Sequence, residues 1–476
     1  MDVRKTFVAI LLGFAVIVAA GVGSPHAAAQ TGARAPAAGE SATGAGQGTL
    51  VLFGAKIYPV AEPPIERGVL VVEGGKIKAI GPEGKVEIPR GAMVEDVSGQ
   101  VIIPGLVDTH SHVGIYPRPS VPAHQDGNEL TGPVQPALRA IDAIWPADPG
   151  IRMAQAGGVT TANIMPGSGN VVGGQTAYVK LRGNSIEEML IPGALGGLKM
   201  ANGENPKKSY GPRHQAPATR MAEAALARRL FVRAQEYQRK WAAHRKARAE
   251  GKSDVSPPER DLELEPVVEV LEGKRIVQYH THRADDILTV LRLADEFHFR
   301  VVLQHATEAY KVADELARRK VPVSSIIIDA PGGKHEAVDF SLAGAALLER
   351  AGVKLAIHTD DYINNSRFLI REAALAVREG LSEEGALRAL TLNAAEMLDL
   401  GDRIGSLEPG KDADWVVLSG PPFSVYTKVL ATYIAGVKVF DRSRPEDLRY
   451  ATGGFAVAAR YPKLGGAATL PAKGSR

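Results

Sequence analysis

The sequence predicts an α/β protein in which a (β/α)8 TIM barrel is joined to a small discontinuous β-sandwich domain built from both chain ends. In the middle of the chain, residues 101–404, apolar β-like runs alternate with helical stretches, which is the pattern of parallel α/β folds. Two turn-rich β segments, residues 48–100 and 405–445, flank this middle region. A chain of 476 residues also exceeds what one hydrophobic core usually supports, so two folding units are expected.

The first residues have the pattern of a secretory signal peptide, which we assign to residues 1–29. Arg4 and Lys5 are followed by an apolar run over residues 7–22, and the small alanines at 27–29 provide a cleavage site. The alternative is a membrane anchor, because the apolar run approaches the length of a short spanning helix. The glycines in the run and the small-residue site favour cleavage.

Composition limits the cellular locations and the classes of binding partner that are expected. Residues 30–47 consist mostly of Ala, Gly, Ser and Thr, which predicts a disordered leader. The chain has no cysteine, so any metal must be held by His, Asp, Glu or a modified Lys, and no lipid-attachment site is present. A periplasmic or secreted protein without a stable membrane anchor after signal cleavage is therefore expected. The net charge of +3 and the lack of a basic run interleaved with aromatics argue against a nucleic-acid partner.

The two flanking segments are predicted to form one sheet domain. In the first segment, β-like runs at residues 50–53, 68–72 and 76–80 are separated by turns that contain Gly or Pro. Runs of the same kind return at residues 414–418 and 428–439. The first segment contains no catalytic candidate, so the chemistry is expected in the middle region.

The middle region has the strand count of a (β/α)8 barrel, whose chemistry lies at the carboxyl ends of the strands. Helices are expected at residues 152–156, 284–297 and 309–320. The eight strands are expected at residues 101–112, 158–164, 175–181, 195–200, 275–280, 300–305, 322–328 and 353–360.

A long insertion, about residues 203–262, separates the fourth and fifth strands. Residues 218–250 are rich in Ala, Arg, Lys and Glu with apolar residues at roughly helical spacing, which predicts a charged helical excursion packed over the barrel. The alternative is a lid over the active site or a subunit contact, so a homo-oligomer is left open. Residues 446–476 are assigned as a C-terminal tail.

Four predicted strand ends carry residues of the kind that bind metals. His110 and His112 end the first apolar run, and they share one face because successive strand side chains point to opposite faces. His280, His305 and Asp360 end the fifth, sixth and eighth runs. Imidazoles with one carboxylate suit Zn²⁺, which keeps an open position for water. The metal would lower the pKa of that water toward about 7, and Asp360 is the candidate that takes its proton and returns it to a leaving amine.

Four motifs carry a resemblance to a known family. They are Pro104-Gly105-Leu106-Val107-Asp108-Thr109-His110-Ser111-His112, Gln304-His305-Ala306-Thr307-Glu308, His358-Thr359-Asp360-Asp361 and the segment at 404–417 that begins Ile404-Gly405-Ser406-Leu407-Glu408-Pro409-Gly410. With them the chain, from Gly48 to about Arg442, resembles the metal-dependent amidohydrolase superfamily, in its imidazolonepropionase-like branch.

The resemblance implies an exported metal-dependent amidohydrolase that hydrolyses an amide, cyclic amide or dipeptide bond by metal-activated hydroxide, with Asp360 as general acid and base. His110, His112, His280 and His305 match the family's strand-end metal ligands, and Asp360 matches its eighth-strand metal ligand. Members with two metals carry a carboxylated lysine on the fourth strand, and Lys199 ends the predicted fourth strand here. One Zn²⁺ is therefore expected, or two if Lys199 is carboxylated; the alternative is a substrate-binding or surface lysine.

Several neighbouring residues complete the prediction. His282 and His335 are candidates for substrate contact, His358 is expected to be a hydrogen-bonding partner one layer deeper, and Asp108 is expected to support the His110 ring. The remaining histidines of the barrel region are treated as surface or loop residues: His124, His214, His244 and His298.

Two polar loops are interpreted as substrate-shaping. The Gly-rich residues 167–174 follow the second strand and lack the lysine and spacing of a phosphate-binding loop. Residues 202–207 follow the fourth strand.

Two other functions stay open at this point. One is deamination of a heterocycle with the same metal set, although Glu308 does not occupy the place of the glutamate that such deaminases use. The other is a non-catalytic metal- or ligand-binding protein. The loops that set specificity vary without changing the framework, so the sequence does not identify the small-molecule amide or peptide substrate.

Overall fold

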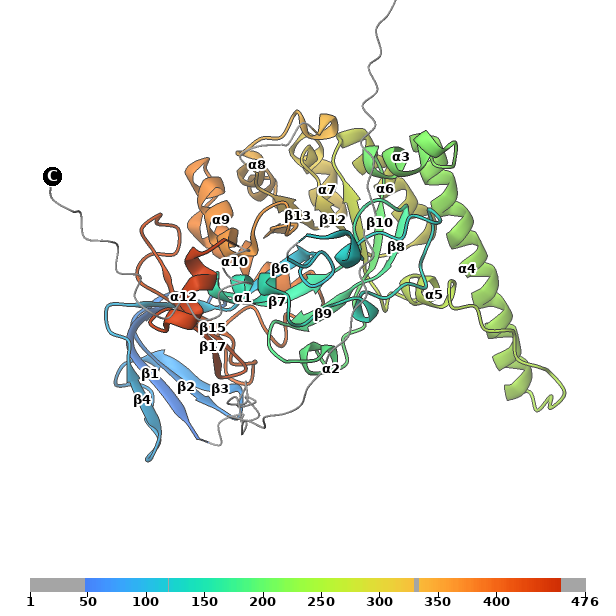
Figure 1. The fold of residues 1–476 in the computed structure, drawn as a ribbon. Helices are drawn as coiled ribbons and strands as arrows, with labels where there is room; N and C mark the ends of the chain where they lie inside the picture. Colours follow the sequence, from blue (N-terminus) through green and yellow to red (C-terminus); the bar gives the residue numbers. More distant parts are fainter. Residues whose placement is uncertain (1–47, 119, 329–333, 455–476) are drawn as a thin grey trace, which may run out of the picture. The chain divides into compact units, whose positions relative to one another are not determined.

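A computed structural model describes residues 48–118, 120–328 and 334–454 (Figure 1). The predicted signal peptide, the leader and the end of the predicted tail lie outside these residues. The described start of the tail is a helix, α12 (Pro445–Thr452), where we expected none. Within the described part of the chain, no helix combines the length and apolarity needed to cross a membrane.

Strands from both ends of the chain form one mixed sheet, drawn in blue and red-brown in Figure 1. Its order is β17-β16-β15-β5-β1-β2-β3, with β4 pairing β1. The junction between the two ends is the antiparallel pair β15–β5, so the predicted discontinuous sheet is present. The predicted first barrel strand, 101–112, is wrong in one respect: its start, β5, belongs to this sheet, and a separate strand begins at Leu106. The strands are β1 (Leu50–Ile57), β2 (Ile65–Glu73), β3 (Lys76–Pro82), β4 (Met93–Asp96), β5 (Val101–Pro104), β15 (Trp415–Leu418), β16 (Val429–Ile434) and β17 (Val437–Asp441).

Both faces of this sheet carry apolar clusters because its strand residues alternate between them. Leu52, Leu70 and Trp415 lie in one cluster, whereas Val51 and Val69 lie in another. All the strands form a single hydrogen-bonded sheet, and the description as a sandwich stays a prediction.

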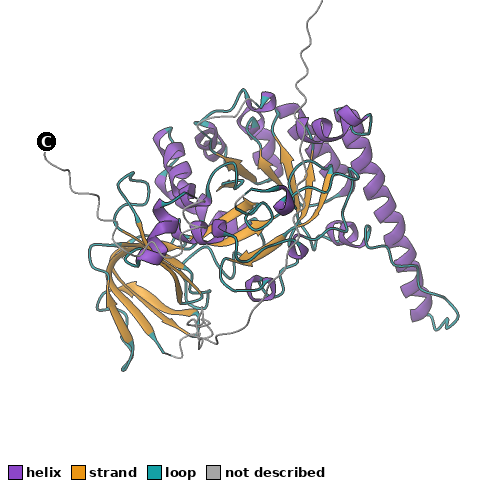
Figure 2. Cartoon of the chain, viewed as in Figure 1, coloured by secondary structure: helices purple, strands orange, loops and turns teal. Residues whose placement is uncertain are grey.

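Seven parallel strands carry the middle region, close to the predicted positions. Nearly all of their residues are buried, as expected for parallel strands covered by helices. Figure 2 shows these strands in orange among the purple helices. The strands are β6 (Leu106–Ser111), β7 (Val159–Ile164), β10 (Leu198–Ala201), β11 (Val277–Thr281), β12 (Val301–His305), β13 (Val323–Ile326) and β14 (Leu355–His358).

The third strand differs from the prediction. Instead of one parallel strand at 175–181, the chain forms β8 (Val172–Gln175), antiparallel to β10, and β9 (Ala177–Lys180), antiparallel to β7. A parallel crossover needs a dozen or more residues, and the connection from β7 to β8 spans only residues 165–171. The chain therefore turns back and still fills the third position between β7 and β10.

The first and last parallel strands are also neighbours. His112 N–H donates to the Asp361 carbonyl and Asp360 N–H donates to the His110 carbonyl, both at 3.0 Å. These bonds join the ends of β6 and β14, so that the predicted ligands on both strands come together.

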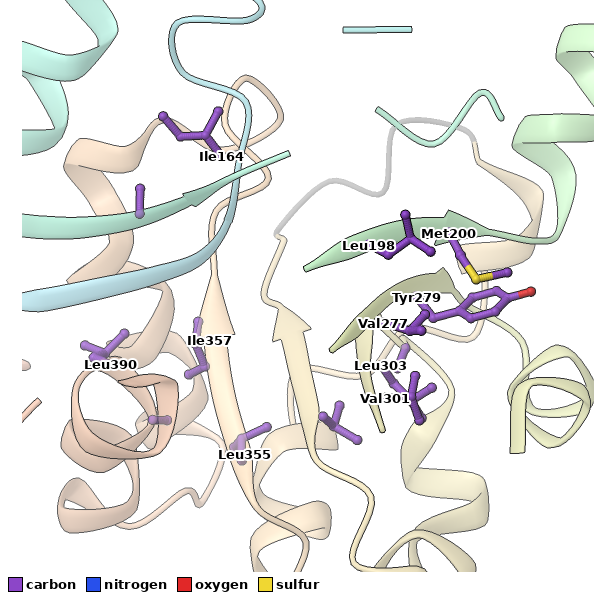
Figure 3. Close-up of a cluster of buried hydrophobic side chains, with 14 of the residues drawn as sticks. Ile164, Leu198, Met200, Val277, Tyr279, Val301, Leu303, Leu355, Ile357 and Leu390 are labelled. Atoms are coloured by element: carbon purple, nitrogen blue, oxygen red, sulfur yellow. The ribbon is translucent and has the colours of Figure 1, made fainter. Parts of the chain in front are cut away.

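Each parallel strand has an apolar face toward the helices and a polar face inward. Figure 3 shows the apolar face, with Val277 and Tyr279 of β11 beside Leu303 of β12. Gln278 and His280 alternate with them on β11. Amphipathic helices cover the apolar face; α6 (Ala284–Phe297), for example, matches the predicted bounds, with acidic residues in its first turn favouring the helix dipole.

Outside the insertion, the middle region contains eight further α-helices among the described residues. They are α1 (Pro149–Ala156), α2 (Ile186–Met189), α5 (Glu265–Leu271), α7 (Ala313–Arg319), α8 (Gly344–Arg350), α9 (Leu369–Arg378), α10 (Glu383–Leu390) and α11 (Leu392–Glu396).

The insertion is helical, as predicted. It contains α3 (Glu204–Tyr210) and the long α4 (Arg220–Ala249), whose N-cap Thr219 accepts a hydrogen bond from Ala222 N–H. Phe231 of α4 stacks on Phe297 at the end of α6, with ring centroids 5.0 Å apart. This contact packs the first half of α4 against α6, and the alternative role of the insertion as a lid or subunit contact stays a prediction.

Candidate metal centre

Five strand ends bring the predicted ligands into one buried cluster. Three sets of three residues each place one ligand atom per residue within 4.8 Å of the others. The sets are His110, His112 and Asp360; His280, His282 and His305; and His110, His305 and His358. Lys199 joins the cluster from β10, with its Nζ 3.0 Å from His110 Nε2.

Asp360 faces the first histidine pair. Its Oδ1 lies 3.0 Å from His112 Nε2 and 3.4 Å from His110 Nε2. Asp360 has a φ of 51° and His305 a φ of 67°, the left-handed region that residues other than glycine rarely adopt. Such strain is typical of residues that a functional site holds in place.

The partners of the first two rings determine their tautomers. His112 Nδ1 lies 2.7 Å from the Met165 carbonyl, which can only accept, so Nδ1 carries the proton. His110 Nδ1 lies 3.2 Å from Gln304 Oε1, and the Gln304 amide N–H donates to Gln278, which orients that oxygen toward the ring.

Both rings consequently direct Nε2 at the Asp360 carboxylate. An imidazole nitrogen with a free lone pair and a carboxylate oxygen 3.0 Å apart repel each other unless a proton or a metal cation lies between them. The donor set of imidazole nitrogen and carboxylate oxygen is one that Zn²⁺ accepts. These residues therefore fit a metal ion.

In the second set, which consists of His280, His282 and His305, one ring nitrogen has no hydrogen-bond partner among the described residues. Within the described chain, buried His280 Nδ1 has no hydrogen-bond partner. Burial lowers the pKa of His280, His282 and His305 well below the usual value, with further lowering by nearby Lys334 or by neighbouring rings. The rings are therefore neutral near pH 7, the form in which imidazole binds metals.

His358 lies one layer deeper, as predicted. It contacts Ser324 Oγ at 2.7 Å through Nδ1 and His305 Nδ1 at 3.0 Å through Nε2. Burial lowers its pKa to about 3. Its two hydrogen bonds position the His305 ring.

Lys199 is fully buried between His110 and Met165 Sδ, so the surface-lysine alternative is wrong. Burial lowers its pKa to about 7, although the charge of Asp360 opposes that shift. A substantial neutral fraction of this amine is therefore present near pH 7.

Two aspartates on neighbouring strands have different environments. Burial alone would raise the pKa of Asp360, but the hydrogen bond and charge of His112 outweigh it and lower the pKa. Burial raises the pKa of Asp108 to about 7. The Asp108 carboxylate accepts hydrogen bonds from Thr359 and from the backbone of His110, while Gln304 contacts the ring. The expected support of the His110 ring by Asp108 is therefore wrong, because Asp108 reaches the backbone instead.

A cavity of about 530 Å³ opens above the cluster. His112, His280, His282, His305 and Asp360 form part of its wall. Both segments interpreted as substrate-shaping loops also contribute to the wall, through residues 167–169 and 204–205, although the second segment is helical from Glu204. This volume suits a small molecule rather than a polymer.

After β13, the predicted substrate contact at His335 is wrong, and the neighbouring Lys334 lines the cavity instead. His335 is exposed and does not line the cavity, whereas Lys334 does. Lys334 Nζ lies 2.7 Å from His282 Nε2 and 3.3 Å from His280 Nε2. His282, the other predicted substrate contact, does line the cavity.

Comparison with known proteins adds independent findings. The amidohydrolase family matches residues 101–439. Amidohydrolase tasK of Hapsidospora irregularis is 31% identical over 79% of this chain, and the chain spans 39% of that relative's length. A solved amidohydrolase from Thermotoga maritima MSB8 is 41% identical with a TM-score of 0.77, covering 83% of this chain and all of that one. An imidazolonepropionase of Thermoplasma volcanium is 34% identical over 23% of this chain and 29% of its own length.

Proposed function

The chain belongs to the amidohydrolase family, and on that premise we propose that it is a zinc-dependent hydrolase of amide, cyclic amide or dipeptide bonds. The observation that carries the proposal is that His110 Nε2 and His112 Nε2 both lie within 3.4 Å of the Asp360 carboxylate. Without a proton or a cation between them, these groups would repel one another.

His110, His112 and Asp360 would hold one zinc ion, and His280 and His305 a second. Carboxylated Lys199 would provide a ligand shared by the two, since its Nζ lies 3.0 Å from His110 Nε2. When bound, zinc supplies Lewis acidity that lowers the pKa of a water molecule and polarises an amide carbonyl.

The residues of the chain supply the proton transfers. His112 keeps the pKa of Asp360 low, so this carboxylate is ionised near pH 7 and can accept the proton of an attacking water. Asp360 lines the cavity, from which it can then donate the proton to the departing nitrogen. His112 and His110 are held by the Met165 carbonyl and Gln304, so neither ring needs to reorient during the reaction.

The proposal also includes the predicted fold, location and partners. The ring of neighbouring strands, with β8 and β9 in the third position, is the (β/α)8 barrel, and the sheet from both chain ends is its β-sandwich domain. The protein acts outside the cytoplasm after removal of residues 1–29, on a small-molecule amide or peptide and without a nucleic-acid partner.

Removal and return of the metal test the proposed function. Purified protein is stripped with a chelator, reloaded with zinc and assayed against dipeptides, N-acyl amino acids and cyclic imides. We expect hydrolysis that disappears on stripping and returns with zinc. Zinc-loaded protein that hydrolyses no member of the panel would instead support a binding protein, and release of ammonia from a heterocycle would support a deaminase.

A further inference from the structure

Lys334 is a cation in the cavity wall that the proposed metal chemistry does not use. Its side chain is 23% exposed, and it follows β13 on the rim of the cavity. His282 Nε2 accepts one of its hydrogen bonds at 2.7 Å, and the buried Glu336 carboxylate lies 3.2 Å from Nζ. These two contacts fix the ammonium group beside the predicted ligands.

The third N–H of the Lys334 ammonium faces His280 Nε2, an atom that could also bind a metal ion. A lysine ammonium has three N–H donors, and the third contact of Nζ is His280 Nε2 at 3.3 Å. A ring nitrogen has one lone pair, so it cannot accept from Lys334 and bind a metal ion at the same time. A metal ion held through Nε2 would leave the third Lys334 donor without its acceptor, next to the cavity.

Other donors face the same part of the cavity. Asn205 Nδ2 lies 3.5 Å from His280 Nε2 and donates to Ser168 Oγ at 2.8 Å. Both residues line the cavity with Lys334. A group that accepts several hydrogen bonds and carries negative charge, such as a carboxylate, complements this wall.

The rest of the cavity wall includes an apolar surface. Ile326 and Ile328 come from the end of β13 and the residues after it, and Tyr362 and Ile363 follow Asp360. Tyr362 is 56% exposed and Ile363 is 53% exposed, so apolar area at the cavity mouth is available to a ligand.

We propose that Lys334 binds a free carboxylate of the substrate, and that the preferred substrates are dipeptides or N-acyl amino acids with an apolar residue at the carboxyl end. The apolar side chain would contact Ile326, Ile328 and Ile363. This assignment rests on the proposed function, because it names the substrate class of the same site.

Matched acids and amides test the assignment on the wild-type protein. Glycyl-L-leucine and glycyl-L-leucinamide differ only in the terminal group, and cleavage of the glycyl–leucyl bond is measured for both. We expect kcat/KM of the zinc-loaded protein to favour the acid by about 10- to 100-fold, the range for one charge-assisted hydrogen bond. Equal values for the two would overturn the assignment.

Lysine variants identify which side chain causes the preference for the acid over the amide. Lys334→Met should remove the preference by raising KM for the acid alone. Lys311→Met, at an exposed ion pair with Asp339, is the matched control and should keep the preference. Lys208→Met tests the other cavity lysine, which Glu204 pairs at 2.6 Å on the rim. A preference lost only in Lys208→Met would contradict the proposal, as would a Lys334→Met variant that lowers kcat on acid and amide alike.

Direct binding separates this proposal from the proposed function. Isocaproate and isocaproamide contain no bond to hydrolyse between two residues, and calorimetry measures their binding to zinc-loaded wild type and Lys334→Met. We expect tighter binding of isocaproate that is lost in Lys334→Met, even if no amide is hydrolysed. Amide hydrolysis with isocaproate binding unaffected by Lys334→Met would leave the proposed function intact and overturn the carboxylate assignment.

Discussion

The two histidines beside Asp360 are each oriented through the ring nitrogen that faces away from it. For His112 the partner is a backbone carbonyl, and for His110 it is an amide whose own orientation Gln278 fixes. Hydrogen bonds of this kind set the tautomer of metal-binding histidines and typically change metal affinity by about 10- to 100-fold. The two rings are therefore oriented by residues that do not line the cavity.

At the same scale, the proposed carboxylation of Lys199 would determine the number of metal ions. Lys199→Met keeps the buried volume but removes the amine that can be carboxylated, so we expect bound zinc to fall from two ions per chain to one. Elemental analysis after zinc saturation and dialysis measures this, with Lys208→Met as the control. Wild type with a single ion, or a variant that retains two, would contradict the bridging role.

The sequence predicted which strand-end side chains come together, but not the groups that orient them. His110, His280 and His305 end apolar runs, where the period of a strand determines the direction of the side chain. Lys334 lies outside any strand, where no side-chain period applies, so the sequence pattern could not distinguish it from His335. Met165 acts through its carbonyl oxygen, which leaves no side-chain pattern to recognise.

At the level of elements, the insertion reaches the cavity through the start of α3, which the start of α4 contacts. Glu223 in the first turn of α4 accepts the Gly203 N–H, and Glu336 accepts the Glu204 N–H at the start of α3. Asn205 on α3 lines the cavity, so the packing of α4 determines where this part of the wall lies. The helix periodicity predicted α4, but the antiparallel course of β8 and β9 depended on a connection length that the strand pattern alone did not reveal.

The docking of α4 should depend on pH through Glu223. Burial raises the pKa of Glu223 from 4.5 to about 8, although the Gly203 hydrogen bond opposes the shift. The folded protein thus keeps a proton that the unfolded chain releases, and stability contributed below pH 4.5 is lost as the pH rises toward 8. The slope from one such group is at most about 1.4 kcal/mol per pH unit.

Glu223→Gln should therefore flatten the decline in stability between these pH values, since glutamine still accepts the Gly203 N–H. Denaturant unfolding across the range measures it, with Glu236→Gln on the exposed side of α4 as the control. Identical pH slopes for wild type and Glu223→Gln would refute the role of this carboxyl.

For the whole molecule, an ion cluster ties the two-ended sheet to the strands that carry the site. Lys180 at the end of β9 pairs with Asp414 and, at 3.0 Å, with Asp412; Asp412 in turn binds Lys76 of β3 at 2.7 Å. The β runs at both chain ends predicted that they share one sheet. The charges that attach this sheet to β9 could not be predicted, because they join residues far apart in the sequence.

Asp414→Ala should destabilise the protein by about 3 kcal/mol, since it leaves the nearly buried Lys180 with a weaker partner. The change also removes the acceptor of the Ala435 N–H. Asp142→Ala breaks an exposed pair with Arg139 and should cost less than about 1 kcal/mol. Chemical denaturation compares the two; equal losses would show that the cluster does not anchor the sheet.

The rate of amide hydrolysis by zinc-loaded Asp360→Asn, with zinc content measured in the same samples, tests the proposed chemistry most directly. Asparagine can still contact zinc through its oxygen but cannot carry a proton, and a positioned acid–base group contributes about 10²- to 10⁴-fold. We predict a fall in kcat of that size with the circular dichroism spectrum unchanged. A variant that binds zinc and hydrolyses the same substrate within tenfold of wild type would contradict the role of Asp360.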